Sequence, residues 1–259
     1  MQSLDSFLER HVESLVAGQK APIDLAEVAR QANAVVEERE MIPEAAMAPD
    51  GEGFRIYVQC NFLQLTGART RQRFSFSHEI AHTFFFELRD GVMKPRRDAP
   101  TGARLEAACQ KGAGLLLVPT NLLRQELRQC GDPIDAAQIL RLAHQFDASV
   151  EVTMRRLYDV DAFGSQFAPV LVRRDARGNF NIEFGVYPPW VKALFPHPRR
   201  GTAFTTWFGH TSGHETQANI DQEPVNGVLV KGTAQGTLMA RPVDITPSLR
   251  IFELRLQPG

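Results

Sequence analysis

The chain has 259 residues, of which 43% are hydrophobic and 23% charged, so it is long enough for one large domain or two smaller ones. Its 29 Lys and Arg residues balance 30 Asp and Glu residues, and the formal net charge of -1 argues against a protein that coats a polyanion. No segment approaches the roughly 20 apolar residues that span a bilayer, and the first residues have no signal-peptide core. Three cysteines at unrelated spacings predict no disulfide framework. We therefore expect a cytoplasmic protein with no membrane partner.

The first part of the chain is predicted to be mostly helical, with one strand. Apolar residues recur at helical spacing over residues 4–16, and Asp24 is placed to cap a second helix that continues to residue 32. Residues 38–53, EREMIPEAAMAPDGEG, are rich in Pro and Gly and predict a loop. Residues 54–60, FRIYVQC, are β-branched and aromatic and predict a strand. No Pro or Gly interrupts residues 71–88, so a helix is expected there.

Helices are predicted to continue along the next part of the chain. Gly and Pro break it over residues 89–102, and an apolar helix is expected over residues 103–118, ending before a proline. Two shorter helices are predicted over residues 134–145 and 149–159, with a tight turn between them.

The composition changes beyond about residue 164, where short strand-like runs alternate with Gly, Pro and Asn. We therefore place a domain boundary near residues 162–168. The sequence predicts an α+β fold in which residues 1–130 form a mostly helical domain with a small sheet. Residues 131–163 form a helical segment that resembles a helix-turn-helix, and residues 164–259 form a β-rich domain.

The residues that carry chemistry are an H-E-x-x-H sequence, which begins at His78. Positions four apart project from the same face of a helix, so His78 and His82 are placed to ligate one metal ion. Glu79 is placed to take a proton from a water in an open coordination position, whose pKa Zn²⁺ lowers to about 7. Phenylalanines flank the motif, so its helix is expected to be buried, and buried His and Glu need partners. The alternative is a pair of core histidines bonded to backbone carbonyls.

A catalytic metal site of this type needs a third protein ligand. Glu106 lies 24 residues after His82, and residues 105–119 contain no other acidic residue, so its carboxylate is the candidate. The alternative is that an acid at a helix N-terminus only interacts with the helix dipole. Two imidazoles and one carboxylate suit Zn²⁺, and they also suit Mn²⁺ or Fe²⁺.

Two segments together, RTRQRFSFSHEIAHTFFF and LEAACQKGAGLLLVP, resemble the ImmA/IrrE family of bacterial metallopeptidases. The residues that match the lead-in to the His-Glu motif and the second helix of that family are Arg71, Arg73, Phe74, Gly112, Ala113, Leu116, Leu117 and Pro119. The resemblance covers roughly residues 20 to 160. It implies a zincin-like core, Glu106 as the third metal ligand and a location in the cytosol. It also implies cleavage of a protein substrate, a repressor-type transcription regulator, in a stress-response or mobile-element switch.

In the mechanism that we expect, Glu79 acts as the general base and later passes the proton to the leaving amine. The strand predicted over residues 54–60 is a candidate edge on which an extended peptide adds as a further strand. The alternative is an ordinary interior strand. No residue is identified as the stabiliser of the oxyanion.

Two other classes of function are alternatives. The first is a transcription regulator or interaction module that binds DNA or a repressor and uses the metal structurally. Residues 134–158 contain three Arg and three acidic residues, so their charge does not support a DNA-reading helix. The second is a metal-binding interaction protein that has lost turnover, and the complete His-Glu-His-Glu set argues against it.

The C-terminal region carries no comparable motif. The corresponding region of IrrE is GAF-like, so the resemblance suggests a small-ligand sensor, with substrate recognition, autoinhibition and scaffolding as alternatives. His210 and His214 lie in GHTSGHE, whose glycines disfavour a helix, so a polar surface loop is predicted there instead of a second metal site. Four aromatic residues of this region either line a pocket or form core: Trp190, Phe195, Trp207 and Phe208.

Overall fold

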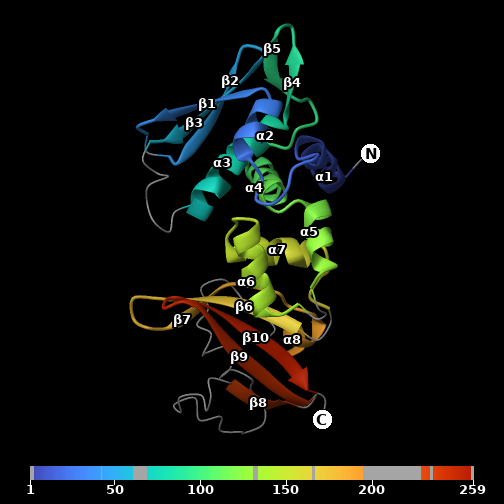
Figure 1. Ribbon diagram of the computed structural model, residues 1–259, viewed down its shortest axis with the longest axis vertical. Coiled ribbons are helices and arrows are strands. Elements are labelled where there is room, and N and C mark those ends of the chain that lie inside the picture. The colour runs from blue at the N-terminus through green and yellow to red at the C-terminus, as the bar shows by residue number, and fades with distance from the viewer. Residues whose placement is uncertain are drawn as a thin grey trace. The chain divides into compact units, whose positions relative to one another are not determined.

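The structure is a computed structural model that describes residues 3–41, 43–60, 69–130, 134–164, 167–194, 229–233 and 236–257 (Figure 1). Its helices are α1 (Leu4–Leu15), α2 (Leu25–Gln31), α3 (Arg69–Thr83), α4 (Ala103–Leu117), α5 (Thr120–Leu127), α6 (Ala136–Gln145), α7 (Val150–Asp159) and α8 (Pro189–Leu194). Its strands are β1 (Ala34–Arg39), β2 (Ala45–Asp50), β3 (Gly53–Gln59), β4 (Phe86–Arg89), β5 (Val92–Pro95), β6 (Phe167–Arg174), β7 (Phe180–Gly185), β8 (Leu229–Thr233), β9 (Gly236–Thr246) and β10 (Leu249–Gln257). This mixture confirms the α+β class.

The chain divides into two compact units. One comprises Met1–Gln129 with Arg141–Val160, and the other comprises Cys130–Leu140 with Asp161–Gly259. None of the helices within the described ranges combines the length and the apolarity needed to cross a membrane.

Local capping explains where several helices of the first unit begin. Asp24 precedes α2, and its carboxylate accepts hydrogen bonds from the backbone N–H groups of Ala26 and Glu27, as the sequence predicts. Ser149 caps α7 in the same way by accepting from the N–H of Val152. These caps satisfy backbone donors that have no partner inside the helix.

The prediction of a loop over residues 38–53 is wrong, because most of this segment belongs to a sheet. The end of β1 and the whole of β2 lie within it, and β2 pairs antiparallel with β3 across a tight turn at residues 50–53. Gly51 supplies a positive φ of 60° in this turn. Pro49 is tolerated because β2 is an edge strand. Cross-strand hydrogen bonds therefore override the weak β-propensity of an alanine-rich segment.

The helix predicted over residues 71–88 ends earlier than expected, at Thr83. Residues 86–89 instead form β4, which pairs with β5 across the two-residue turn Asp90-Gly91. Both turn residues have positive φ, 56° and 75°, which is the geometry that an Asp-Gly turn favours. The hairpin thus replaces the last turn of the predicted helix and part of the predicted loop over residues 89–102.

The sheet of the first unit has the order β1-β3-β2, so β3 lies in its centre. It pairs in parallel with β1 and antiparallel with β2. The proposed use of residues 54–60 as a free edge is therefore wrong, since both sides of this strand are already bonded. Helix α3 packs against β2 and β3, and α4 packs against α3, so the sheet supports the helix that carries the H-E-x-x-H motif.

The second unit contains an antiparallel sheet with the order β7-β6-β10-β9-β8. Its core is the cluster of Ala168, Val170, Val172, Ile182, Val191, Ala240, Phe252 and Leu254. The buried carboxylate of Glu253 accepts a hydrogen bond from the N–H of Ala136 at 2.7 Å, which satisfies one donor at the start of α6. The His210–His214 motif and three of the candidate pocket aromatics, Phe195, Trp207 and Phe208, lie outside the described residues.

Candidate metal centre

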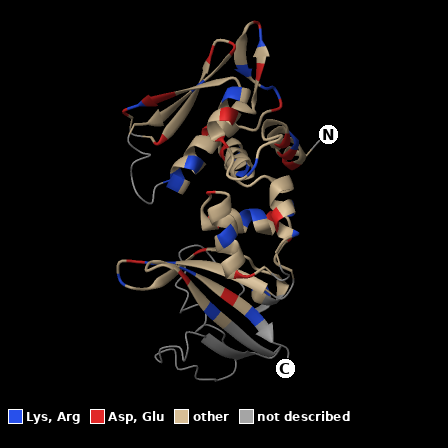
Figure 2. Cartoon of the chain, in the orientation of Figure 1, with Lys and Arg blue, Asp and Glu red and all other residues tan. Residues whose placement is uncertain are grey.

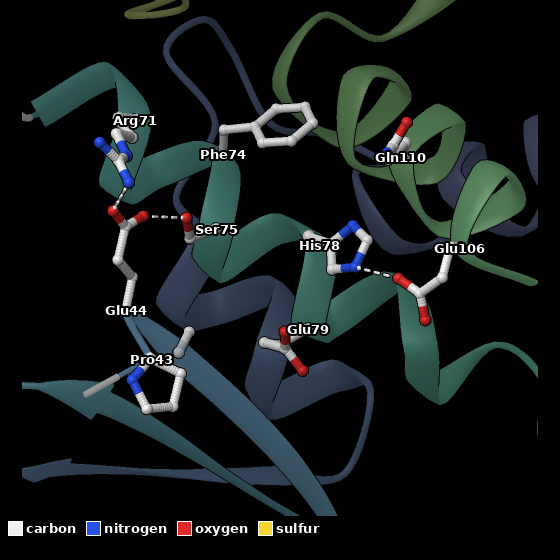
Figure 3. A pocket seen from close by; sticks show the side chains of 10 residues that line it. Pro43, Glu44, Arg71, Phe74, Ser75, His78, Glu79, Glu106 and Gln110 are labelled. Atoms are coloured by element: carbon white, nitrogen blue, oxygen red, sulfur yellow. Dashed lines mark hydrogen bonds and ion pairs between the residues drawn. The ribbon is translucent and has the colours of Figure 1, made fainter. Parts of the chain in front are cut away.

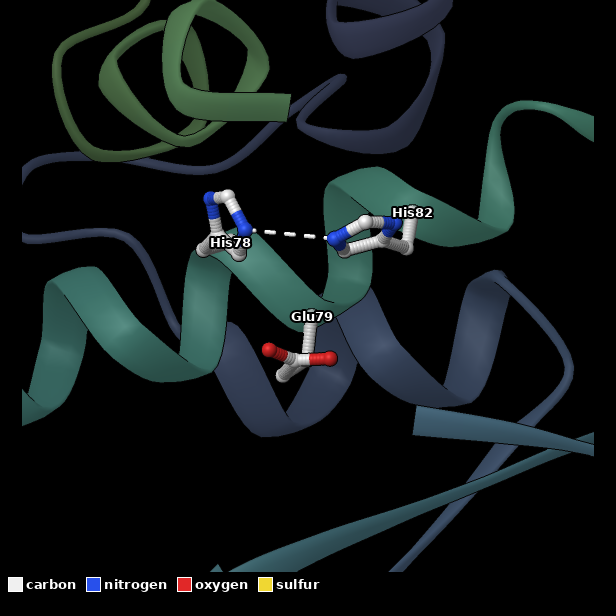
Figure 4. Close-up of side chains that lie close together, drawn as sticks. All are labelled: His78, Glu79 and His82. Atoms are coloured by element: carbon white, nitrogen blue, oxygen red, sulfur yellow. Dashed lines mark hydrogen bonds between the residues drawn. The ribbon is translucent and has the colours of Figure 1, made fainter. Parts of the chain in front are cut away.

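Helix α3 places the two histidines of the motif side by side. His78 and His82 lie one turn apart, and their Nε2 atoms are 3.2 Å from each other (Figure 4). Each side chain is less than one fifth exposed. The buried face of α3, which includes Ile80 and Ala81, points away from this pair and into the core. The two imidazoles therefore lie at the margin of the core, where an ion can reach them.

Glu106 approaches the histidines from α4, the neighbouring helix (Figure 3). Its Oε2 atom is 3.3 Å from Nε2 of His78, and its Oε1 atom is 3.8 Å from Nε2 of His82. Glu106 belongs to the first turn of α4, where the helix dipole also favours a carboxylate. The structure thus brings together the three residues that the sequence predicts as metal ligands, while their roles remain predictions.

The donor set suits a first-row divalent metal ion. Two ring nitrogens and one carboxylate converge with separations of 3.2 to 3.8 Å, which matches the three-ligand sites of catalytic zinc. Burial, and then the neighbouring His78, lower the pKa of His82, whereas Glu106 opposes this shift. His82 is therefore neutral near pH 7 and has a lone pair available for a metal.

Glu79 projects from α3 in a different direction from the two imidazoles, on the side of the helix that faces β2 (Figures 3 and 4). Its pKa is raised, chiefly because burial removes water from the carboxylate, and the nearby Glu106 adds to the effect. A hydrogen bond from the backbone N–H of Met47 in β2 opposes this rise. Glu79, His78 and His82 form a compact group whose ligand atoms lie within 4.8 Å of one another. A raised pKa matches the proton-transfer role predicted for Glu79.

Cys109 is a neighbour of the site that sequence reasoning did not identify. It lies on α4 one turn after Glu106 and is fully buried. Burial, together with the charges of Glu106 and Glu79, raises the pKa of its thiol to about 12. The thiol therefore remains protonated near pH 7, which disfavours its use as a nucleophile or a ligand.

A cavity of about 490 Å³ opens beside His78, Glu79 and Glu106. Its opposite wall contains Glu44 and Ser75, which sequence reasoning also missed. Glu44 immediately precedes β2, in a segment predicted as loop, so no local pattern indicated that it would face the metal centre. The cavity therefore reaches the candidate metal centre at His78.

An H-E-x-x-H helix with a third carboxylate converging from a second helix defines the kind of metal site that metallopeptidases use. Residues 29–158 match the family model described as the IrrE N-terminal-like domain, peptidase M78. This match covers half of the chain, and the chain therefore belongs to that family. The resemblance seen in the two sequence motifs is thereby confirmed. A search of curated proteins finds no match to this chain.

Proposed function

We propose that this protein is a metal-dependent endopeptidase that cleaves a protein substrate. The observation that carries the proposal is the convergence of His78, His82 and Glu106 beside a cavity that Glu79 also borders. Membership of the M78 peptidase family supports the same activity. We assign Zn²⁺ as the metal, because its usual ligands include imidazole and carboxylate, and Mn²⁺ and Fe²⁺ share this preference.

In the proposed mechanism the metal ligands and Glu79 have separate roles. His78, His82 and Glu106 hold the ion, which when bound supplies a Lewis acid that acidifies water and polarises the scissile carbonyl. Glu79 takes a proton at its carboxylate and passes it to the leaving amine. Its raised pKa brings proton uptake and release closer to neutral pH than an exposed glutamate would allow.

Among the described strands, β2 is an outer one of its sheet, and its edge opposite β3 is the surface on which we propose that an extended substrate docks. The carbonyl of Glu44 accepts a hydrogen bond from the N–H of Gln59 in β3. Because bonding alternates along an antiparallel strand, Ala45 and Met47 turn their backbone groups away from β3. The N–H of Met47 already bonds to Glu79, so this edge borders the proposed base, and the carbonyl of Met47 and the backbone groups of Ala45 are the ones that face a substrate. A peptide that adds to β2 would thus pass beside the reacting groups.

The family also supports a narrower proposal for the biological role. We propose that the substrate is a repressor-type transcription regulator, cleaved in the cytoplasm within a stress-response or mobile-element switch. The search for it starts from cleavage-site profiling with a proteome-derived peptide library, in which mass spectrometry identifies the products.

The test of the activity is the variant Glu79→Gln. It removes the proton acceptor but no proposed metal ligand, so metal content should equal that of wild type while library cleavage falls by about 10²-fold or more. His82→Ala is the matched control, because it should lose both metal and cleavage. Cleavage at the wild-type rate in metal-loaded Glu79→Gln would refute the assignment of Glu79 as the base.

A further inference from the structure

The cavity wall opposite the metal centre is formed by an ordered polar cluster of Arg71, Glu44 and Ser75 (Figure 3). Glu44 uses both carboxylate oxygens in this cluster. Its Oε1 atom pairs with the Arg71 guanidinium, and its Oε2 atom accepts a hydrogen bond from the Ser75 hydroxyl at 2.6 Å. The Glu44 side chain is 19% exposed, whereas that of Arg71 is 74% exposed. The acidic member is therefore enclosed, and the basic member faces the solvent.

Arg71 is the only lysine or arginine among the described residues that line the cavity, so it supplies the cationic donors of this wall. A guanidinium has five N–H donors and no acceptor, and the pairing with Glu44 engages only one side of it. Glu44 also restrains the guanidinium, so less side-chain entropy is lost when Arg71 binds another group. The exposed side of the Arg71 guanidinium therefore favours an anionic acceptor, and a planar carboxylate matches it best.

Arg71 is distinguished from the two other arginines on the first turns of α3, where Figure 2 shows basic residues. Arg69 pairs with the carboxylate of Asp147 at 2.7 Å. Arg73 donates to the backbone carbonyls of Asp147 and Ile23 and is mostly buried. These two arginines hold α3 in the first unit, whereas Arg71 lines the cavity.

The distance from Arg71 to the metal centre determines which substrate residue it reaches. Arg71 and His78 are seven residues apart and lie on the same face of α3, so they are separated by about 10.5 Å along the helix axis. An extended peptide advances about 3.3 Å per residue, so this separation corresponds to about three residues.

We propose that Arg71 determines substrate specificity by binding an Asp or Glu side chain about three residues from the scissile bond. This inference rests on the proposed peptidase function. It names the substrate class as peptides with an acidic residue near the cleavage site, and it assigns Glu44 and Ser75 as the residues that position Arg71.

The test compares metal-loaded wild type with Arg71→Gln and with Arg69→Gln. Arg69 is the matched control, because it lies on the same helix, is also 74% exposed and does not line the cavity. A peptide cleaved from the library is resynthesised with Glu, Gln or Lys at each of the positions two to four residues on either side of the bond. Values of kcat and KM are measured for each peptide, together with the affinity of the Glu79→Gln variant for the same peptides.

In wild type we expect kcat/KM for the Glu peptide to exceed that for its Gln isostere by about tenfold at one of the substituted positions. The difference should lie mainly in KM. The preference should vanish in Arg71→Gln, persist in Arg69→Gln and reappear as a tenfold difference in binding to Glu79→Gln. Metal content should be the same in all these variants. Cleavage with no acidic preference, or with a preference that survives Arg71→Gln, would overturn this inference alone. Failure of wild type to cleave any peptide would instead refute the proposed function, and this inference with it.

Discussion

The contact between Gly112 and Ala81 sets how closely the two ligand-bearing helices approach. A Cβ atom added at Gly112 of α4 would lie 2.9 Å from the Cβ of Ala81 in α3 and 3.5 Å from the ring of Phe84. Ala81 immediately precedes His82, and Glu106 lies on the same helix as Gly112. Carbon atoms pack best at about 3.5–4.0 Å, so Gly112→Ala requires the helices to separate locally by about 0.6–1.1 Å.

The expected change in the free energy of unfolding follows from two opposing effects. Overpacking costs about 1–3 kcal/mol, and replacing glycine by alanine inside a helix contributes about 1 kcal/mol of stability. Gly112→Ala should therefore destabilise the protein by about 0–2 kcal/mol. Gly114 provides a matched control on the same helix, because its added Cβ would meet only the Arg156 side chain, at 3.5 Å. Gly114→Ala keeps the stability that alanine adds inside a helix and avoids the overpacking. The free energies of unfolding of the two variants should therefore differ by about 1–3 kcal/mol.

Separating the helices also moves Glu106 away from the histidines. Metal affinity in Gly112→Ala should fall by about 10- to 100-fold, the range found when support of a ligand is lost, whereas Gly114→Ala should bind as wild type does. Urea denaturation measures the stabilities, and titration against a chelator measures the affinities. Adding Ala81→Gly to Gly112→Ala removes the clashing methyl group and should restore metal affinity. Equal stability and equal metal affinity of the two single variants would refute this reasoning.

Two further predictions concern the metal and pH. Elemental analysis should find about one equivalent of metal in wild type and none in His82→Ala or Glu106→Ala. Metal retained in Glu106→Ala would mean that another residue is the third ligand. The pKa of His11, whose ring lies 4.4 Å from that of Phe84, is lowered by burial and then by Arg96. The unfolded chain therefore binds this proton more tightly, so the stability contribution is complete above about pH 6.5 and is lost as the pH falls below it. Denaturation curves of His11→Phe should show a weaker decline of stability from pH 7 to 5 than wild type, and identical slopes would contradict the prediction.

Helices with strong local signals were predictable from the sequence. The cap at Asp24 and the helical spacing of the H-E-x-x-H motif depend on residues within one or two turns of each other. The same spacing placed His78 and His82 on one face. The choice of Glu106 needed only the absence of other acids in the helix predicted next, and the structure places its carboxylate 3.3 Å from His78.

The predictions were wrong at two hairpins, where cross-strand pairing decided the structure and the local composition was ambiguous. The alanine-rich segment that becomes β2 has little β-propensity of its own, and it is a strand because β3 supplies its hydrogen bonds. The continuous run through Leu88 looks helical, but β5 draws residues 86–89 into a hairpin. The turn signals Asp50-Gly51 and Asp90-Gly91 were the available clues to both hairpins.

The sequence by itself determined which residue types of the candidate metal centre lie one helical turn apart. Only the tertiary structure decided what surrounds them, namely the approach of α4 at Gly112, the outer position of β2 in its sheet and the pairing of Glu44 with Arg71. The physical reason is that helix geometry fixes neighbours three and four residues apart, whereas contacts between distant segments depend on how the whole unit buries its apolar surface.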